Sequence, residues 1–260
     1  MTNQIKISFK DYLSEVYEKP AKLHEAYRLF HNYSFLNSIL AENQLLKPEP
    51  INTYQGWKKL GRQVKKGSKA ISLMLPVKYK AKSKNEESEK DEVDKICFTK
   101  FIKRPNWFGL SQTEGKEFIS EQLPDFEINK ALANLGITQQ EFSIIDGNCQ
   151  GYALPNQKII VVNPMAYASY KTTIHEMAHC LLHSEEEKIL DGQALDRSVK
   201  EFEAETAAYL VCCSLGKFDH LEYSRGYIRG WIDRSDVEEE NFQRAFDAAN
   251  QVLKAGAIKG

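Results

Sequence analysis

The pentapeptide His175-Glu176-Met177-Ala178-His179 constrains this 260-residue chain more than any other feature. Histidines four residues apart lie about one turn apart on the same face of a helix, so both imidazoles can reach one metal ion. Glu176, next to the first histidine, is in place to activate a zinc-bound water as a general base. The pattern predicts a zinc metallopeptidase site. The alternative is a core helix whose polar groups are satisfied by other partners.

The residues around the pentapeptide predict a buried helix. Asn163-Pro164 is a suitable helix start, because proline is tolerated in the first turn. Apolar residues then recur at helical spacing, at Ala166, Tyr170, Ile174, Ala178, Leu181 and Leu182. Burying two histidines and a glutamate without partners would be costly, so this context favours a metal site.

A third ligand is expected from another element, since catalytic zinc usually takes three protein ligands. His183 follows on the same helix, but a rise of about 1.5 Å per residue places it roughly 12 Å from His175. It is therefore assigned to packing or to the support of a ligand. The segment 201–210 predicts a second helix that ends near Gly216, and on it Glu201 and Glu205 share a face that Glu203 does not.

In this arrangement the chain resembles zincins whose third ligand is a glutamate on a later helix, followed four positions on by an acid that supports a ligating histidine. The resemblance implies Glu201 as the third zinc ligand and Glu205 as the supporting acid. The exchanged assignment stays open. So does the alternative that Glu201, Glu203 and Glu205 form an ordinary acidic solvent face.

Two features bear on the binding of a peptide substrate. Segments 150–154 and 158–162 resemble the two strands of a hairpin, and would offer an edge strand to an extended peptide or serve only as scaffold. An oxyanion could take a hydrogen bond from a tyrosine such as Tyr209, Tyr223 or Tyr227, and the sequence does not select among them.

Charge divides the chain into two parts. Residues 1–118 contain 22 Lys and Arg and 14 Asp and Glu, a net +8, whereas residues 119–260 contain 13 and 22, a net −9, which together give −1. We therefore expect two domains in an α+β protein. The first, residues 1–118, is a small domain of helices plus an antiparallel sheet. The second, residues 119–260, is a zincin-like, mainly helical metallopeptidase domain with an upstream β-hairpin.

Residues 50–85 contain ten basic side chains and no acidic one. Cations that follow phosphates, interleaved with aromatic rings on which bases stack, suit single-stranded nucleic acid. The alternative is that the lysines are only solvated and the aromatic residues belong to the core. The candidate nucleic-acid-binding residues are Tyr54, Trp57, Lys58, Lys59, Arg62, Lys65, Lys66, Lys69, Lys103 and Arg104.

Several stretches resemble ArdC-type antirestriction proteins. Residues 33–37, 56–71 and 108–115 are similar to the N-terminal domain of that family, and residues 172–174 and 227–231 extend the similarity around the pentapeptide and the glutamate helix. The resemblance covers most of the chain. It implies a single-stranded DNA-binding domain fused to a zincin-like metallopeptidase domain with Zn²⁺ as cofactor. Such proteins are carried by plasmids, phages or integrated elements and are thought to protect incoming DNA from host restriction.

Two other functions stay open. One is a regulatory zinc peptidase that cleaves a protein partner and uses the basic domain for docking. The other is a non-catalytic single-stranded DNA-binding protein with a structural zinc site. The charged segment 81–95 departs from the family pattern and is expected to be a solvent loop.

Location and redox state follow from what the sequence contains. No secretory signal or transmembrane segment is found, so no membrane partner is expected and a cytoplasmic location is the default. The five cysteines are odd in number and lack paired metal spacing, so reduced thiols are expected.

Overall fold

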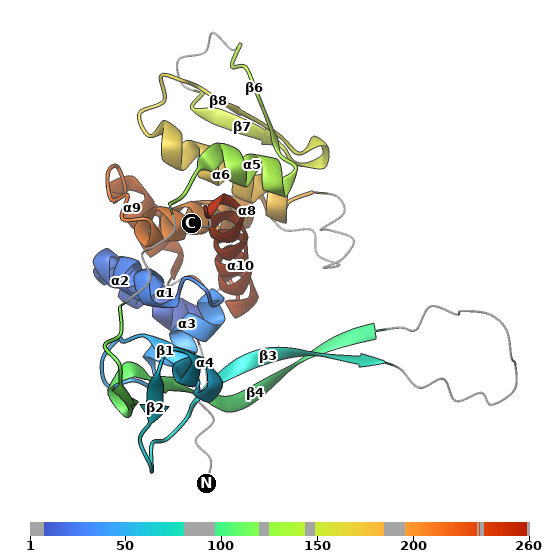
Figure 1. Cartoon of the computed structure of the whole chain (residues 1–260). Helices are drawn as coiled ribbons and strands as arrows, with labels where there is room; N and C mark the ends of the chain where they lie inside the picture. The colour runs from blue at the N-terminus through green and yellow to red at the C-terminus, as the bar shows by residue number, and fades with distance from the viewer. Residues whose placement is uncertain are drawn as a thin grey trace, which may run out of the picture. The chain divides into compact units, whose positions relative to one another are not determined.

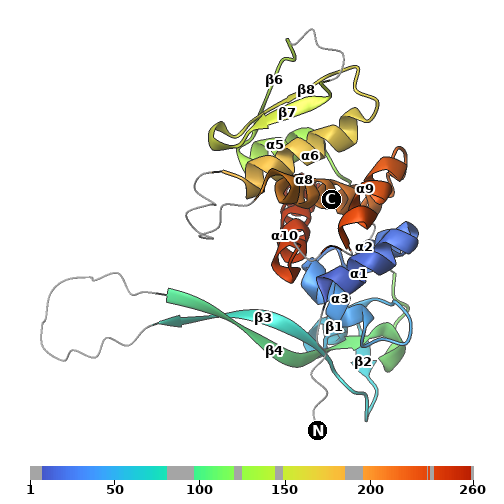
Figure 2. The same cartoon turned by 180° about the vertical axis from the view of Figure 1, so that it is seen from behind.

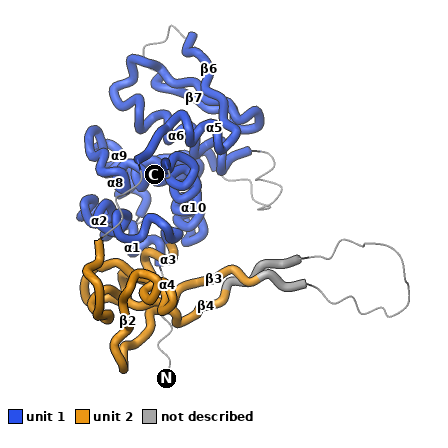
Figure 3. Tube along the Cα trace, viewed as in Figure 1, with its two compact units in different colours: residues 1–35, 121–260 blue, residues 36–120 orange. Residues whose placement is uncertain are grey.

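The computed structural model of the chain describes residues 8–80, 97–119, 125–143, 149–184, 196–232, 234 and 237–258, without the side chains of residues 78–80 and 97–101. The chain forms two compact units (Figure 3). Unit 1 comprises Met1–Phe35 and Glu121–Gly260, and unit 2 comprises Leu36–Ser120. The first helices therefore pack with the C-terminal part of the chain. The division at residue 118 stays a prediction about domain families, and the charged segment 81–95 lies outside the described residues.

Unit 2 is built on a long antiparallel hairpin (Figures 1 and 2). Strand β3 (Ile71–Lys80) pairs with β4 (Cys97–Gly109), from Ile71 opposite Trp107 to Lys80 opposite Cys97. Strand β1 (Ile51–Thr53) pairs with the end of β4, which gives a three-stranded sheet in the order β1-β4-β3. A second ribbon joins β2 (Arg62–Val64) to β5 (Thr113–Gly115). The remaining elements are the helices α3 (Phe35–Glu42) and α4 (Tyr54–Lys59) and the 3-10 helix η1 (Leu110–Gln112).

The core of unit 2 contains Trp57, which the sequence placed among the DNA-contacting aromatic residues. Its side chain is 1% exposed, and its indole N–H donates to the carbonyl of Phe108 at 2.8 Å. The ring also meets Phe118 edge-on, with centroids 5.3 Å apart. Trp57 therefore stabilises α4 against the sheet and offers no face on which a base could stack. That part of the prediction is wrong.

Unit 1 combines helices with a small sheet. Strand β8 (Ile159–Val162) lies between β6 (Thr138–Gln140), to which it is parallel, and β7 (Gly151–Leu154), to which it is antiparallel. The 3-10 helix η2 (Pro155–Gln157) connects β7 to β8, as expected for the predicted hairpin. The helices are α1 (Phe9–Glu18), α2 (Pro20–Phe30), α5 (Ile128–Leu135), α6 (Ser169–Leu182), α8 (Arg197–Ser214), α9 (Glu222–Ile232) and α10 (Glu239–Gly256).

Helix α8 lies at the centre of unit 1. Every residue from Phe202 to Ser214 is buried, and α8 packs against α2, α6, α9 and α10. Its N-cap is Asp196, whose carboxylate accepts the amide N–H of Ser198 at 3.1 Å. The apolar face of α10 is also buried. This packing fixes α8 beside α6, the helix that carries the pentapeptide.

The helix start predicted at Asn163-Pro164 is wrong, because α6 begins at Ser169. The side-chain oxygen of Asn163 accepts the amide N–H of Met165 at 2.9 Å, and its carbonyl accepts that of Ala166 at 2.9 Å. Asparagine can satisfy nearby backbone groups in this way and so competes with helix formation. The pair forms a turn that leads from β8 towards α6.

Two other expectations concern cysteines and membrane spans. Cys149, Cys180, Cys212 and Cys213 carry free thiols, and Cys180 is buried as a core residue. Among the described residues, no helix is both long and apolar enough to cross a membrane.

Replacing Phe202 with alanine tests the packing of α8. Phe202 is fully buried and contacts Phe242 of α10 and Trp231 of α9, with centroids 5.1 and 5.9 Å away. The cavity should lower the free energy of unfolding by about 3–5 kcal/mol, measured by denaturant titration. The same truncation at Phe218, which is 39% exposed, should cost about 1 kcal/mol or less. Equal losses for the two variants would contradict this account of the core.

Candidate metal centre

Three predicted ligand atoms converge between α6 and α8. The Nε2 atoms of His175 and His179 lie 3.1 Å apart, and Glu201 Oε2 lies 3.4 Å from the first and 3.6 Å from the second. Ligand atoms 2.0–2.1 Å from a tetrahedral zinc ion lie roughly 3.3 Å from one another. The observed separations therefore fit one ion held by two imidazoles and a carboxylate. Among the described residues these three form the candidate metal cluster.

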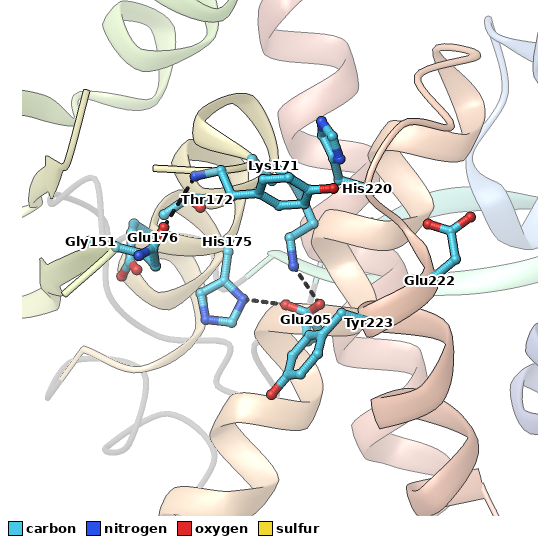
Figure 4. Close-up of a pocket in the computed structure, with 12 residues that line it drawn as sticks. Gly151, Lys171, Thr172, His175, Glu176, Glu205, His220, Glu222 and Tyr223 are labelled. Atoms are coloured by element: carbon cyan, nitrogen blue, oxygen red, sulfur yellow. Dashed lines mark hydrogen bonds and ion pairs between the residues drawn. The ribbon is translucent and has the colours of Figure 1, made fainter. Parts of the chain in front are cut away.

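Glu205 lies on the opposite side of the first histidine. Its Oε2 atom is 3.0 Å from Nδ1 of His175, and its Oε1 atom is 2.7 Å from the ammonium of Lys171, as Figure 4 shows. Because Nδ1 points away from the cluster of Nε2 atoms, Glu205 is placed to orient His175 rather than to share its ion. This placement favours Glu201 over Glu205 as the third ligand.

The imidazoles and carboxylates of the cluster stabilise one another's charged forms. Burial alone would lower the pKa of His175, but hydrogen bonds with Glu201 and Glu205 and the nearby carboxylate charges raise it to about 9 in the metal-free protein. Burial would likewise raise the pKa of Glu205, yet His175 and Lys171 lower it to about 2. Hydrogen bonds from His175 and His179 hold the pKa of Glu201 well below its ordinary value. The acids are thus ionised and ready to hold a cation.

Glu176 faces a cavity of about 500 Å³ beside this cluster. The residue is 7% exposed, and burial raises the pKa of its carboxyl group despite the two neighbouring histidines. Strand β7 runs close by: a Cβ atom at Gly151 would meet Thr172 Cγ2 at 2.9 Å and Glu176 Oε1 at 3.3 Å. Glycine at this position therefore lets the strand approach the carboxyl group.

The opposite wall of the cavity is aromatic. Tyr223 lines it, whereas Tyr209 is fully buried and Tyr227 is not among the lining residues (Figure 4). His220 also lines the cavity, has a left-handed φ of 63°, and lies against Tyr167 with ring centroids 4.1 Å apart. Of the three tyrosines that the sequence offered, Tyr223 is the one that lines this cavity.

His183, which the sequence assigned to packing or to the support of a ligand, contacts the second candidate ligand. Glu203, which the sequence left off the face shared by Glu201 and Glu205, contacts His183 in turn. Nδ1 of His183 lies 2.8 Å from Nδ1 of His179, and its Nε2 lies 3.0 Å from Glu203 Oε2. Burial lowers the pKa of His183 to about 2 and raises that of Glu203 to about 7. The spacing of His183 from His179 was the available signal, because residues four apart on a helix can touch. The partner of Glu203 could not be found in this way.

The predicted nucleic-acid-binding residues differ in their exposure. The exposed cations are Lys58, Lys59, Lys65, Lys66, Lys69, Lys103 and Arg104. Tyr54 is 39% exposed, and its hydroxyl accepts a hydrogen bond from Gln63. Lys65 donates to the carbonyl of Ser111 at 3.0 Å. Arg62 instead holds β5, donating to Thr113 Oγ1 at 2.8 Å and to the carbonyls of Thr113 and Lys116. Arg62 is therefore a structural residue of unit 2, unlike the exposed lysines.

The fold and the donor set define an α+β protein with a candidate site for a divalent metal. Residues 2–104 match the sequence model of the N-terminal domain of anti-restriction factor ArdC. The match is to the same domain that residues 33–37 and 56–71 resemble.

Other similar proteins cover more of the chain. An uncharacterized protein of Bacillus anthracis is 26% identical over 258 residues, with 82% of this chain and 43% of that protein covered. The chain thus spans less than half the length of this curated relative. The metal-free crystal structure of antirestriction protein ArdC from plasmid R388 has a TM-score of 0.50 at 20% identity, covering 95% of this chain and 94% of that one. Its Mn(II)-bound structure gives 0.46 at 19% identity, with 94% and 97% covered.

Substituting each acid with glutamine distinguishes the roles of Glu201 and Glu205. Glu201→Gln replaces the carboxylate nearest both Nε2 atoms, so zinc affinity should fall by more than a hundredfold in a competition titration with a chromophoric chelator. Glu205→Gln leaves the three ligand atoms in place and should weaken zinc binding by about 10–100-fold. If Glu205→Gln is the more damaging change, the two glutamates have exchanged roles.

Proposed function

We propose that this protein is a single-stranded DNA-binding, zinc-dependent metallopeptidase of the antirestriction type, carried by a mobile genetic element. The observation that carries the proposal is the convergence of His175, His179 and Glu201 beside the buried carboxyl group of Glu176. Three protein ligands next to a cavity suit a catalytic zinc site better than a structural site, which is usually closed by four.

The chemistry rests mainly on Glu176. Zinc, when held by the two histidines and Glu201, supplies a Lewis acid for the scissile carbonyl and favours ionisation of the attacking water. Glu176 takes the proton from that water and delivers it to the nitrogen of the leaving amine. Its buried position raises its affinity for a proton, which suits a group that must accept one and later donate it. Tyr223 is positioned on the cavity wall to contact the substrate.

The strand at the cavity wall suits an extended peptide as the substrate. Strand β7 pairs with β8 along one side, and among the described strands no other pairs with its second side. A peptide chain can add to such an edge through main-chain hydrogen bonds. Gln150 and Gly151 line the cavity, so a peptide pairing with β7 would pass next to Glu176.

Unit 2 supplies the DNA-binding function in this proposal. The exposed cations include Lys58, Lys59 and Lys66, and cations of this kind neutralise phosphates without reading sequence. Support also comes from the match of residues 2–104 to the ArdC N-terminal domain and from the antirestriction protein with a similar fold. Base stacking would fall to exposed rings such as Tyr54.

Substituting Glu176 with glutamine separates metal binding from hydrolysis. The variant keeps all three ligand atoms and should bind zinc within about threefold of wild type, while hydrolysis of a peptide library should fall at least a thousandfold because the base is lost. Mass spectrometry of the cleaved library measures the effect. Undiminished hydrolysis in Glu176→Gln would sink the proposed mechanism, and the absence of cleavage by wild type would favour a non-catalytic metal site.

Removing two lysines tests the DNA-binding surface. The double variant Lys58→Ala and Lys59→Ala should lower affinity for single-stranded oligonucleotides about tenfold at 0.1 M salt. It should also reduce the slope of log affinity against log salt by about 1.4, since two phosphate contacts are lost. Fluorescence anisotropy measures both. The matched control removes two exposed lysines of unit 1, Lys217 and Lys254, and should leave the slope unchanged. An equal effect of the two variants would mean that binding reflects total charge alone.

A further inference from the structure

A line of buried side chains extends from the second candidate ligand into the core of unit 1. His179 meets His183 through their Nδ1 atoms at 2.8 Å, and His183 Nε2 meets Glu203 Oε2 at 3.0 Å. The other oxygen of Glu203 accepts from Asn241 Nδ2 at 2.8 Å and from Arg244 Nε at 3.1 Å. The side chains of His183 and Glu203 are 3% and 0% exposed. The line therefore joins the end of α6 to α8 and α10, and its middle, at His183 and Glu203, is closed to water.

With Glu203 ionised beside Arg244 and both imidazoles neutral, only one placement of protons satisfies this line. A carboxylate accepts hydrogen bonds, so Nε2 of His183 must donate to Glu203, and Nδ1 of His183 is then an acceptor. That acceptor requires Nδ1 of His179 to carry a proton. Nε2 of His179 is left with a free lone pair, and this is the atom that faces His175 Nε2 and Glu201. The contact with His183 thus fixes the tautomer of His179 that metal binding needs.

Arg244 holds the end of the line that lies farthest from His179. The Nη2 atom of Arg244 donates to the carbonyl of Leu182 at 2.8 Å, while its Nε atom donates to Glu203. The amide N–H of His183 donates to the carbonyl of His179 at 3.0 Å, which closes the last turn of α6. Both backbone and side-chain contacts therefore fix His183 relative to His179, and the charge of Glu203 faces that of Arg244.

We infer that His183 is a positioning residue for the metal centre: held by Glu203, it fixes the tautomer and the ring orientation of His179. The inference rests on the proposed function, since it concerns the same zinc ligand. It gives the second histidine a support equivalent to the one that Glu205 gives the first. Such supporting partners typically contribute 10–100-fold to metal affinity.

Two substitutions at one position separate this role from simple packing. In His183→Asn, the side-chain oxygen can occupy the place of Nδ1, so the acceptor for His179 is kept and the donor to Glu203 is lost. In His183→Gln, the longer side chain reaches towards Glu203 but leaves no acceptor beside His179. We expect zinc affinity, measured by chelator competition, to fall 10–100-fold for Gln and to stay within about threefold for Asn.

Controls keep the outcome decisive. His24→Gln removes a histidine of the same unit, whose Nδ1 lies 2.7 Å from the carbonyl of Ser214, and should bind zinc within about threefold of wild type. Thermal unfolding of the metal-free variants checks that each folds. Should His183→Gln not fold, Glu203→Gln replaces it, and the loss of charge at the end of the line should again weaken zinc binding severalfold.

Each result has a distinct meaning. Weak binding by Gln with retention by Asn supports the inference. Unchanged affinity in His183→Gln, or equal losses in both variants, overturns it and makes His183 a packing residue, while leaving the peptidase proposal intact if wild type binds zinc. A wild-type protein that does not bind zinc overturns the proposed function and this inference together.

Discussion

The pairing of imidazoles at α6 with carboxylates on α8 is the interaction on which the candidate metal site depends. His175, His179 and His183 recur at intervals of four along one helix, and Glu205, Glu201 and Glu203 meet them from the other. The buried carboxylates of Glu203 and Glu205 would be very costly alone, but each lies 3.0 Å from an imidazole nitrogen. The packing of α8 against four other helices keeps the partners at those distances. The candidate metal site is therefore a product of the core as much as of the motif.

Local spacing explains what could be predicted of this site. The positions of His175, Glu176 and His179 follow from the geometry of one helix, and a face shared by Glu201 and Glu205 follows from the same rule. The role of Glu203 could not be derived in this way, because Asn241 and Arg244 approach it from α10, a helix far along the chain. A carboxylate with no local partner resembles a solvent-exposed one until the tertiary structure is known. His183 was set aside as a ligand for a sound reason, its distance from His175, yet its contact with His179 gives it a place in the site.

The fold was predictable where periodicity was strong and less so where one residue type suits two environments. Apolar residues at helical spacing predicted the buried helix that carries the pentapeptide, and segments 150–154 and 158–162 predicted the β7–β8 hairpin. Trp57 illustrates the limit: an aromatic residue between lysines suits either a stacking surface or a core, and the hydrogen bond to Phe108 that decides between them spans distant segments. Asn163-Pro164 likewise suits a helix start or a turn, and the contacts of Asn163 with the next residues select the turn. The packing of the first helices with the C-terminal part depends on contacts that no local pattern encodes.

The contacts that hold His175 and His179 suggest why so many side chains surround the site. A zinc ligand must present one nitrogen and keep the other protonated, and an imidazole that is free to rotate or exchange tautomers would lose part of its binding free energy in ordering. Glu205, fixed by Lys171, constrains His175, and the line through His183 to Glu203 constrains His179. Glu201 has no such burial, since its side chain is 40% exposed at the edge of the site. The core therefore holds the two imidazoles in place, whereas Glu201, the candidate carboxylate ligand, is held by fewer neighbours at the exposed edge of the site.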